Sequence, residues 1–197
     1  MPVQNTTLRY GTVAMTLHWL IAGFVIANIV IGLYMSDLPR GDPSKLEFIS
    51  WHKSIGLTVL ALSILRLVWR LVNPVPPIPA GLNPWIKFAG QASHFLLYFL
   101  IIAVPLAGWL MVSVGSMGHA TPVFGLFGWP SVPILSDMPR SAGHPYHEMF
   151  ETTHVVLAWS MIVLIPIHVL GALYHQFVRG DDVLIRMTPG TRVRGNA

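Results

Sequence analysis

The sequence contains no cysteine. This absence excludes disulfide bonds, iron–sulfur clusters held by thiolates, haem attached covalently through cysteine, and zinc sites built on cysteine. Any metal that the protein binds must therefore be held by histidine, methionine or carboxylate side chains.

Charged residues are also scarce, at 10% of the 197 residues, whereas 53% of the residues are hydrophobic. Because a soluble globular domain is usually about one-quarter charged, this composition is typical of an integral membrane protein. A helix needs about 20 apolar residues to cross a bilayer, so four helices with their connectors use up this length. We expect a single domain over residues 1–197, an all-α bundle of four membrane helices whose partner is the lipid bilayer and not a nucleic acid.

Four long apolar runs mark the predicted membrane spans, at residues 13–35, 51–72, 91–113 and 152–178. The first run is a span and not a signal peptide, because it lacks a small-residue cleavage pattern and is too long. The connectors are rich in proline and glycine, so no regular helix is expected in them. They comprise residues 36–45, 73–85 and 115–148. In the longest, the apolar stretch "VFGLFGW" is expected to lie along the membrane interface.

The distribution of charge predicts the orientation of the chain. Eight of the twelve basic residues fall on the side of the two termini, with two acidic residues, giving 8 − 2 = +6. The other side has four basic and six acidic residues, giving 4 − 6 = −2. The eight are Arg9, Arg66, Arg70, Lys87, Arg179, Arg186, Arg192 and Arg194, and the four are Arg40, Lys45, Lys53 and Arg140. By the positive-inside rule we expect both termini to be cytoplasmic.

Histidines occur at two depths in the predicted spans. His18 and His168 lie in the cytoplasmic half, whereas His52 and His154 lie toward the outer side. His154 and His168 are fourteen residues apart, which places them on one helix face and roughly 21 Å apart along it. The fourth helix therefore offers one imidazole to each half of the membrane, and topology pairs His18 with His168 and His52 with His154.

A pair of neutral imidazoles inside a helical bundle is a suitable axial ligand set for a b-type haem. Gly32 lies fourteen residues after His18 and is expected to face the outer haem, and Gly56 lies one turn after His52. The alternative is that the histidines are ordinary polar groups bonded between helices and that the glycines only permit close packing. His18 and His168 fit this alternative poorly, because polar side chains deep in a membrane are rare and usually functional.

Other histidines compete with these four or accompany them. His94 has the same cytoplasmic depth as the inner pair and is a rival ligand there. His147 and His175 lie seven residues from the predicted ligands of the fourth helix, on nearly the same face. They are candidates to lie beside a cofactor or substrate, with an ordinary interfacial histidine as the alternative. The sequence assigns no role to His119 and His144.

Four segments, taken in order, resemble the four helices of the bacterial cytochrome b561 family. The segments are "TLHWLIAGFVIANIVIGLYM", "WHKSIGLTVLALSILRLVWR", "SHFLLYFLIIAVPLAGWLM" and "IHVLGALYHQFVRGDDVLIRM". The resemblance covers nearly the whole chain, and it includes the tail "DDVLIRM", which composition alone does not predict.

This resemblance implies a membrane cytochrome with two b haems, whose axial ligands map onto His18, His52, His154 and His168. It also implies respiratory electron transport. One branch of the family is similar to superoxide oxidase, which passes an electron from superoxide at the outer side through both haems to ubiquinone. Other members are haem-bearing electron carriers.

On the superoxide hypothesis, Lys53 is the candidate catalytic residue. It follows His52 directly and is the cation at the edge of the outer haem. An anion approaches along positive potential, so Lys53 would guide superoxide, although the net charge of −2 on this side gives no general attraction.

At the cytoplasmic side, Arg66 and Arg70 are candidates to bind haem propionates or anionic lipid, with simple anchoring as the alternative. A quinone site needs an apolar slot with hydrogen-bond donors and a source of protons. His175, Tyr174 and Arg9 lie near the right depth for it.

Two other classes of function remain open. The chain would suit the haem b subunit of a larger oxidoreductase, with "FGLFGWPSVPIL" in the longest connector docking a periplasmic enzyme or cytochrome. A small histidine-rich metal transporter without haem would instead need polar groups along one continuous path, whereas these histidines fall in two separate layers.

Overall fold

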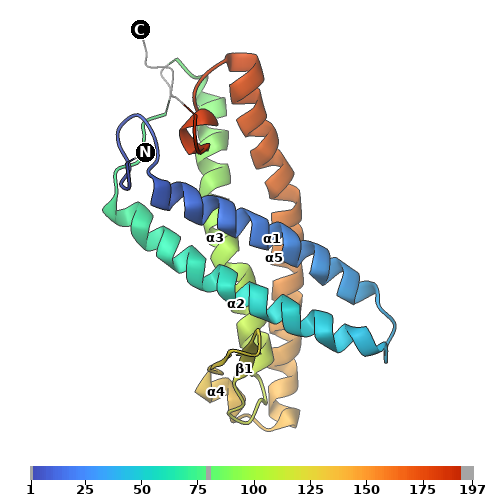
Figure 1. Ribbon diagram of the computed structural model, residues 1–197. Helices are drawn as coiled ribbons and strands as arrows, with labels where there is room; N and C mark the ends of the chain where they lie inside the picture. Colours follow the sequence, from blue (N-terminus) through green and yellow to red (C-terminus); the bar gives the residue numbers. More distant parts are fainter. Residues whose placement is uncertain (1, 79–80, 192–197) are drawn as a thin grey trace. The chain divides into compact units, whose positions relative to one another are not determined.

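The computed structural model describes residues 2–78 and 81–191. Four long helices dominate it (Figure 1): α1 (Thr12–Asp37), α2 (Pro43–Val72), α3 (Pro84–Ser113) and α5 (Arg140–Tyr174). Each is long and apolar enough to cross a membrane. The predicted all-α fold with four spans is therefore confirmed. Arg192 and Arg194, which the sequence analysis counts on the cytoplasmic side, lie outside the described residues.

The apolar windows of these helices bury few of their side chains inside the protein. The buried share runs from 28% of the window in α2 to 6% in the last span. Apolar side chains exposed over so much of four helices suit a lipid environment, where hydrocarbon covers them and the helical hydrogen bonds satisfy the backbone.

Helices α2 and α3 begin several residues before the apolar runs that predicted them. Each begins with a proline that follows a capping side chain, a combination that favours helix initiation. The amide of Ser44 donates to Asp42 Oδ1 at 2.9 Å, and the amide of Trp85 donates to Asn83 Oδ1 at 2.9 Å. The caps therefore start each helix several residues before its uninterrupted apolar run, in turns that still carry a charged residue, Lys45 in α2 and Lys87 in α3.

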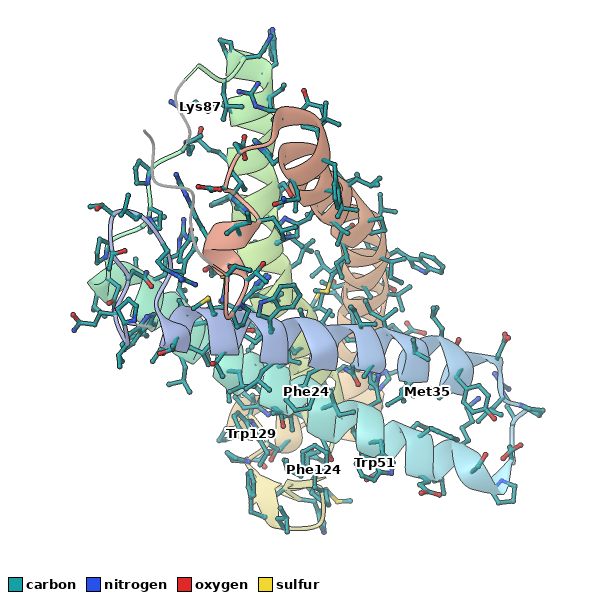
Figure 2. The ribbon with its side chains drawn as sticks, turned by 45° about the horizontal axis from the view of Figure 1, so that its top comes forward. Phe24, Met35, Trp51, Lys87, Phe124 and Trp129 are labelled. Atoms are coloured by element: carbon teal, nitrogen blue, oxygen red, sulfur yellow. The ribbon has the colours of Figure 1, made fainter. Side chains whose placement is uncertain are left out.

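The longest connector is more ordered than predicted. It holds a hairpin of two antiparallel strands, β1 (Thr121–Val123) and β2 (Phe127–Trp129), followed by the short helix α4 (Pro133–Ser136). The stretch "VFGLFGW" forms the turn and the second strand of this hairpin. Figure 2 shows Phe124, at the hairpin turn, beside Trp51 of α2, and the two ring centres are 5.6 Å apart.

The expectation that residues 115–148 contain no regular helix is wrong at the short helix α4 and again in their last part, because α5 begins at Arg140. The carbonyl oxygen of Pro139 accepts a hydrogen bond from Gly143 N at 2.8 Å and opens the helix. Pro145 lies in the second turn, where it removes one intrahelical N–H donor but does not end the helix. Proline content alone therefore does not exclude helix at this position.

The α-helical hydrogen-bond pattern of α5 ends at Tyr174. A π-helical turn, η1 (His175–Arg179), ends at Gly180, whose φ of 66° is left-handed and suits glycine. The chain then turns back through a short 3-10 helix, η2 (Ile185–Met187).

The chain divides into two compact units, and each takes one segment from each of the four long helices. One unit comprises residues 1–21, 62–99 and 161–197, and the other comprises residues 22–61 and 100–160. We call them the His18 unit and the His52 unit, after the first histidine of each.

The cap of α2 generates a prediction about pH. Asp42 accepts hydrogen bonds from the hydroxyl and the amide of Ser44, at 2.6 Å and 2.9 Å. These bonds lower the pKa of the carboxyl below its ordinary value of 3.8. Because the folded pKa is the lower one, the cap stabilises α2 above the ordinary value, and the stabilisation is lost as pH falls through the folded pKa.

We expect the hydrogen-exchange protection factor of the Ser44 amide to fall as pH is lowered below about 4. Asp42→Asn keeps an acceptor oxygen at the cap but does not titrate, so its protection factor should stay constant over the same range. A wild-type protection factor that does not change with pH would contradict this account of the cap.

Candidate functional site

The His52 unit brings His52 of α2 and His154 of α5 together. Their ring centres lie 6.0 Å apart, with an angle of 82° between the ring planes. Nδ1 of His52 donates to the backbone oxygen of Asn28 at 3.2 Å, and Nδ1 of His154 donates to that of Val104 at 2.9 Å. A carbonyl oxygen can only accept, so these contacts place the proton on Nδ1 and leave Nε2 of each ring as an acceptor or metal ligand.

Two glycines make these contacts possible. In an α-helix the oxygen of Asn28 accepts from the amide four residues later, which is that of Gly32. A Cβ at Gly32 would lie 3.0 Å from Cε1 of His52, and a Cβ at Gly108 would lie 3.1 Å from Nδ1 of His154. In both α1 and α3, a glycine four residues after the accepting carbonyl leaves room for an imidazole to approach the backbone.

The His18 unit brings together three imidazoles. His168 of α5 lies between two partners, with ring centres 6.4 Å from His18 of α1 and 5.2 Å from His94 of α3. The structure thus assembles the predicted inner pair and also its rival.

The segment of α2 in this unit contributes Arg66. Its guanidinium donates to the backbone oxygen of Ala14 at 2.9 Å and lies over the ring of Tyr98, 5.5 Å from the ring centre. Arg70 lies over the same ring at 5.1 Å. Arg66 interacts electrostatically with all three imidazoles of the unit. It is therefore a positive charge held within the His18 unit.

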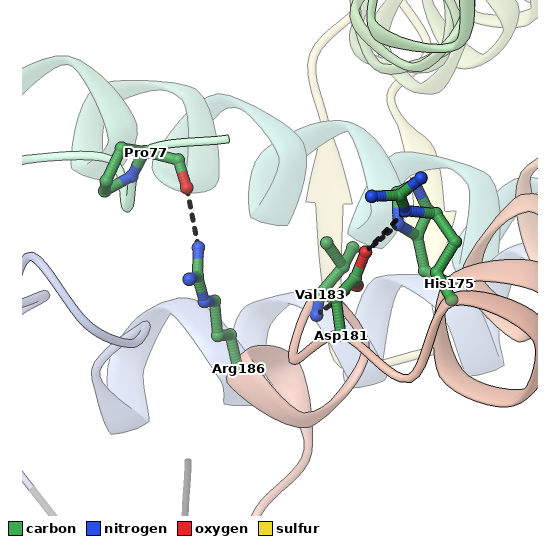
Figure 3. Close-up of polar contacts among 6 residues, drawn as sticks. Pro77, His175, Asp181, Val183 and Arg186 are labelled. Carbon is green, nitrogen blue, oxygen red and sulfur yellow. Dashed lines mark hydrogen bonds and ion pairs between the residues drawn. The ribbon is translucent and has the colours of Figure 1, made fainter. Parts of the chain in front are cut away.

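The C-terminal segment closes back on the end of α5 (Figure 3). Oδ2 of Asp181 accepts from Nδ1 of His175 at 2.7 Å and from Nε of Arg179 at 3.4 Å. The side chains of His175 and Asp181 are only 15% and 18% exposed. Figure 3 also shows Arg186 donating to the backbone oxygen of Pro77, at 2.6 Å.

The other predicted quinone-side residues lie in the same unit. The rings of Tyr174 and His175 are 6.0 Å apart, edge to face. The guanidinium of Arg9 donates to the backbone oxygens of Thr191 and Thr188, at 2.9 Å and 3.4 Å. Arg9 therefore ties the N-terminal segment to the C-terminal one.

Lys53 and His147, the two other candidates of the His52 unit, have no part in the imidazole pair, and neither does His144. Lys53 makes no hydrogen bond or ion pair with any residue in 2–78 or 81–191. His147 and His144 are exposed and face glutamates one turn later on α5, Glu151 at 3.9 Å and Glu148 at 3.6 Å.

Sequence reasoning missed Gly108, the two accepting carbonyls and Asp181. A signal for Gly108 was available, because it lies fourteen residues after His94, the same offset that located Gly32 from His18. The carbonyls had no signal, since every residue carries one. Asp181 meets His175 only because the chain turns at Gly180.

Comparisons with known proteins agree with one another. A family model described as prokaryotic cytochrome b561 matches residues 9–190. The chain is 34% identical to cytochrome b561 homolog 2 of Escherichia coli K12 over 189 residues, 95% of each chain. It is 31% identical to cytochrome b562 of Cereibacter sphaeroides over 182 residues, 90% of this chain and 94% of that one. It is 28% identical to a probable superoxide oxidase, CybB, of Yersinia pestis over 186 residues, 93% of this chain and 98% of the relative.

The glycine contacts generate a prediction with a matched control on the same helix. Gly32→Ala should push the His52 ring away from Asn28 and destabilise the protein by about 1–3 kcal/mol, because the added methyl overpacks the site. Gly23→Ala, also on α1, adds a methyl that meets nothing within 4 Å, so it should be neutral or slightly stabilising. Thermal unfolding of the two variants measures this difference, and equal unfolding midpoints would show that Gly32 is an ordinary packing residue.

Proposed function

The chain belongs to the prokaryotic cytochrome b561 family, and we propose that it carries electrons through two b-type haems, from superoxide at the periplasmic side to ubiquinone. Membership of the family makes it a multi-pass protein of the bacterial inner membrane that binds b-type haem and transfers electrons. Beyond this, we propose that the chain holds two haems through histidine ligands. We also propose superoxide as the electron donor, ubiquinone as the acceptor and a cytoplasmic location for both termini.

The spacing of the imidazole rings is the observation that carries the proposal. An imidazole nitrogen binds a metal ion at about 2 Å, and the ring centre lies about 1 Å behind it, so rings on opposite sides of one iron have centres about 6 Å apart. The His18–His168 and His52–His154 distances are 6.4 Å and 6.0 Å. The His94–His168 distance of 5.2 Å is shorter than this arrangement needs. We therefore assign His18, and not His94, as the partner of His168.

The surroundings of the His52 pair fit a haem. Gly32 and Gly108 leave the imidazoles free of side-chain contact where a Cβ would press on them. The hydrogen bonds at Nδ1 fix the ring orientation and leave Nε2 for the iron, as is usual for metal-bound histidine. A bound haem supplies one-electron oxidation and reduction. In the other unit, Arg66 provides a charge that suits a haem propionate.

Superoxide is an anion, and Lys53 is the residue that we propose guides it. Lys53 follows His52 on α2, and no described residue neutralises its ammonium group. The similarity to a relative named as a probable superoxide oxidase supports this donor.

Reduction of ubiquinone to the quinol consumes two protons together with two electrons. We propose that His175 delivers protons from the cytoplasm and that Asp181 holds its ring in place. Both side chains are largely buried at the end of α5, and a positioned histidine is the most frequent proton donor of this kind. Tyr174 and Arg9 would complete the quinone side of the site.

A second candidate function is the haem b subunit of a larger oxidoreductase, which exchanges electrons between quinone and a periplasmic enzyme or cytochrome. Exposed apolar side chains in the hairpin and α4 favour it, because such patches mark interaction surfaces. Leu126 is 81% exposed, Phe127 56% and Ile134 75%.

The assignment of the inner ligands is tested by two variants. His18→Ala should lose one of two haems per chain, because an iron with a single axial histidine is held weakly. His94→Ala, at the same depth, should retain both haems. The pyridine haemochrome assay measures haem per chain, and loss of a haem from His94→Ala with retention in His18→Ala would reverse the assignment.

The electron donor is tested with purified protein and a superoxide-generating system. We expect rapid haem reduction that superoxide dismutase suppresses, followed by reoxidation on addition of ubiquinone. Lys53→Glu should slow reduction by about tenfold at low ionic strength, and by less at high salt, because the effect is electrostatic. Lys45→Glu, on the same helix, is the control and should change the rate little. Haems that dithionite reduces but superoxide does not would favour the partner-enzyme function instead.

A further inference from the structure

We propose that a pocket between α2 and the hairpin binds a small organic cation through its single ammonium group. The pocket lies in the His52 unit and has a volume of about 220 Å³. One face of α2 and the hairpin turn provide its lining, which consists of Glu47, Ser50, Trp51, Ser54 and Phe124. Nothing in the proposed electron transfer uses this pocket.

The walls of the pocket are held in place by Ser54, which is 1% exposed. Its hydroxyl donates to the backbone oxygen of Ser50 at 2.9 Å and accepts from the amide of Phe124 at 3.0 Å. These bonds connect the hairpin turn to α2. As a result Phe124 meets Trp51 at an angle of 62°, and the two rings form an aromatic corner (Figure 2).

The backbone at the turn is adapted to this contact. Phe124 has a φ of 50° and Gly125 a φ of 70°, both in the left-handed region. The amide of Leu126 donates to the backbone oxygen of Val123 at 2.9 Å across these two residues, so their positive φ values are those of a tight hairpin turn. The turn places the ring of Phe124 against Trp51.

The side chains that line the pocket favour a positively charged ligand. The carboxylate of Glu47 has no hydrogen bond or ion pair with residues 2–78 or 81–191, so it is available to a ligand. The faces of Trp51 and Phe124 attract cations through their ring quadrupoles. An anion such as superoxide would be repelled by Glu47, which separates this pocket from the approach that we propose at Lys53.

The size of the pocket limits the ligand to one head group. A volume of about 220 Å³ is several times that of a water molecule but lies below the range of about 300–1,000 Å³ typical of drug-sized ligands. A primary or quaternary ammonium with a short chain fits this volume. It can belong to a soluble amine or to the head group of a phospholipid, and the chemistry of recognition is the same.

A cation in this pocket should change the reduction potential of a haem held by His52 and His154. Trp51 directly precedes His52, so a bound cation adds positive charge beside the His52–His154 pair. It should raise the reduction potential of a haem held there, because positive charge favours the reduced state. This consequence rests on the proposed function, whereas binding of the cation does not.

Calorimetric titration of the full-length protein in detergent with choline tests the binding directly. We expect saturable binding of one choline per chain and no binding of 3,3-dimethyl-1-butanol, its uncharged analogue. Glu47→Gln should weaken choline binding by about tenfold or more, because it removes only the charge. Asp37→Asn, another exposed carboxylate of this unit, is the matched control and should leave the affinity unchanged. Phe124→Leu keeps an apolar wall without an aromatic face and should weaken binding by about threefold or more.

Two results would overturn the proposal: no saturable binding of choline or ethanolamine by the wild type, or equal affinities for wild type and Glu47→Gln. Repeating the titration in nanodiscs of phosphatidylglycerol alone, and of phosphatidylglycerol with phosphatidylethanolamine, distinguishes the two sources of the cation. A weaker apparent affinity for choline in the second nanodisc supports a lipid head group as the occupant. Equal affinities in the two nanodiscs support a soluble amine.

Discussion

An imidazole inside a membrane needs a partner for each of its nitrogens, because hydrocarbon offers none. The structure satisfies this constraint most plainly in the His52 unit. Each Nδ1 finds a backbone carbonyl on the neighbouring helix, and a glycine four residues along clears the approach. What remains is Nε2 on each ring, and the ring centres lie 6.0 Å apart, the spacing that an iron between them would require. The demand for a partner at Nδ1 thus orients the groups that we assign to the haem.

The residues of the two units recur along the sequence at a fixed offset. An offset of fourteen residues is close to a whole number of helical turns, so it repeats a face at a second depth. All four long helices carry a pair at this offset: His18 and Gly32, His52 and Arg66, His94 and Gly108, and His154 and His168. Each compact unit therefore receives one of these positions from every helix. In one unit they are three imidazoles and a guanidinium, and in the other they are two imidazoles and two glycines.

This difference in composition suggests different properties for the two units. The His18 unit has a fixed positive charge in Arg66 beside its imidazoles, whereas the His52 unit has neutral backbone partners. If each unit holds one haem, the charge of Arg66 should favour the reduced state of the haem beside it. Electrons would then pass more readily from the His52 pair to the His18 pair, in the direction that the proposed function needs.

Much of this arrangement could be predicted from the sequence, because it depends on side-chain identity and helical spacing. Composition and apolar runs predicted the four spans, and depth alone paired His18 with His168 and His52 with His154, rings that the structure brings together. The starts of α2 and α3 were missed because the caps at Asp42 and Asn83 begin each helix ahead of its uninterrupted apolar run, and a cap is not registered by hydrophobicity. Asp181 was missed for another reason, since its contact with His175 depends on a backbone turn and not on spacing. The sequence places His94 at the same depth as His18, and only the ring distances in the structure favour His18 over His94 as the partner of His168.

We propose that each unit holds one iron between two imidazoles. Electron paramagnetic resonance of the air-oxidised purified protein, with the haem iron counted per chain, measures both the number of irons and their ligation. We expect two haem irons per chain, both low-spin with two imidazole nitrogens as ligands. A single haem per chain, or a high-spin iron with one axial ligand, would contradict it.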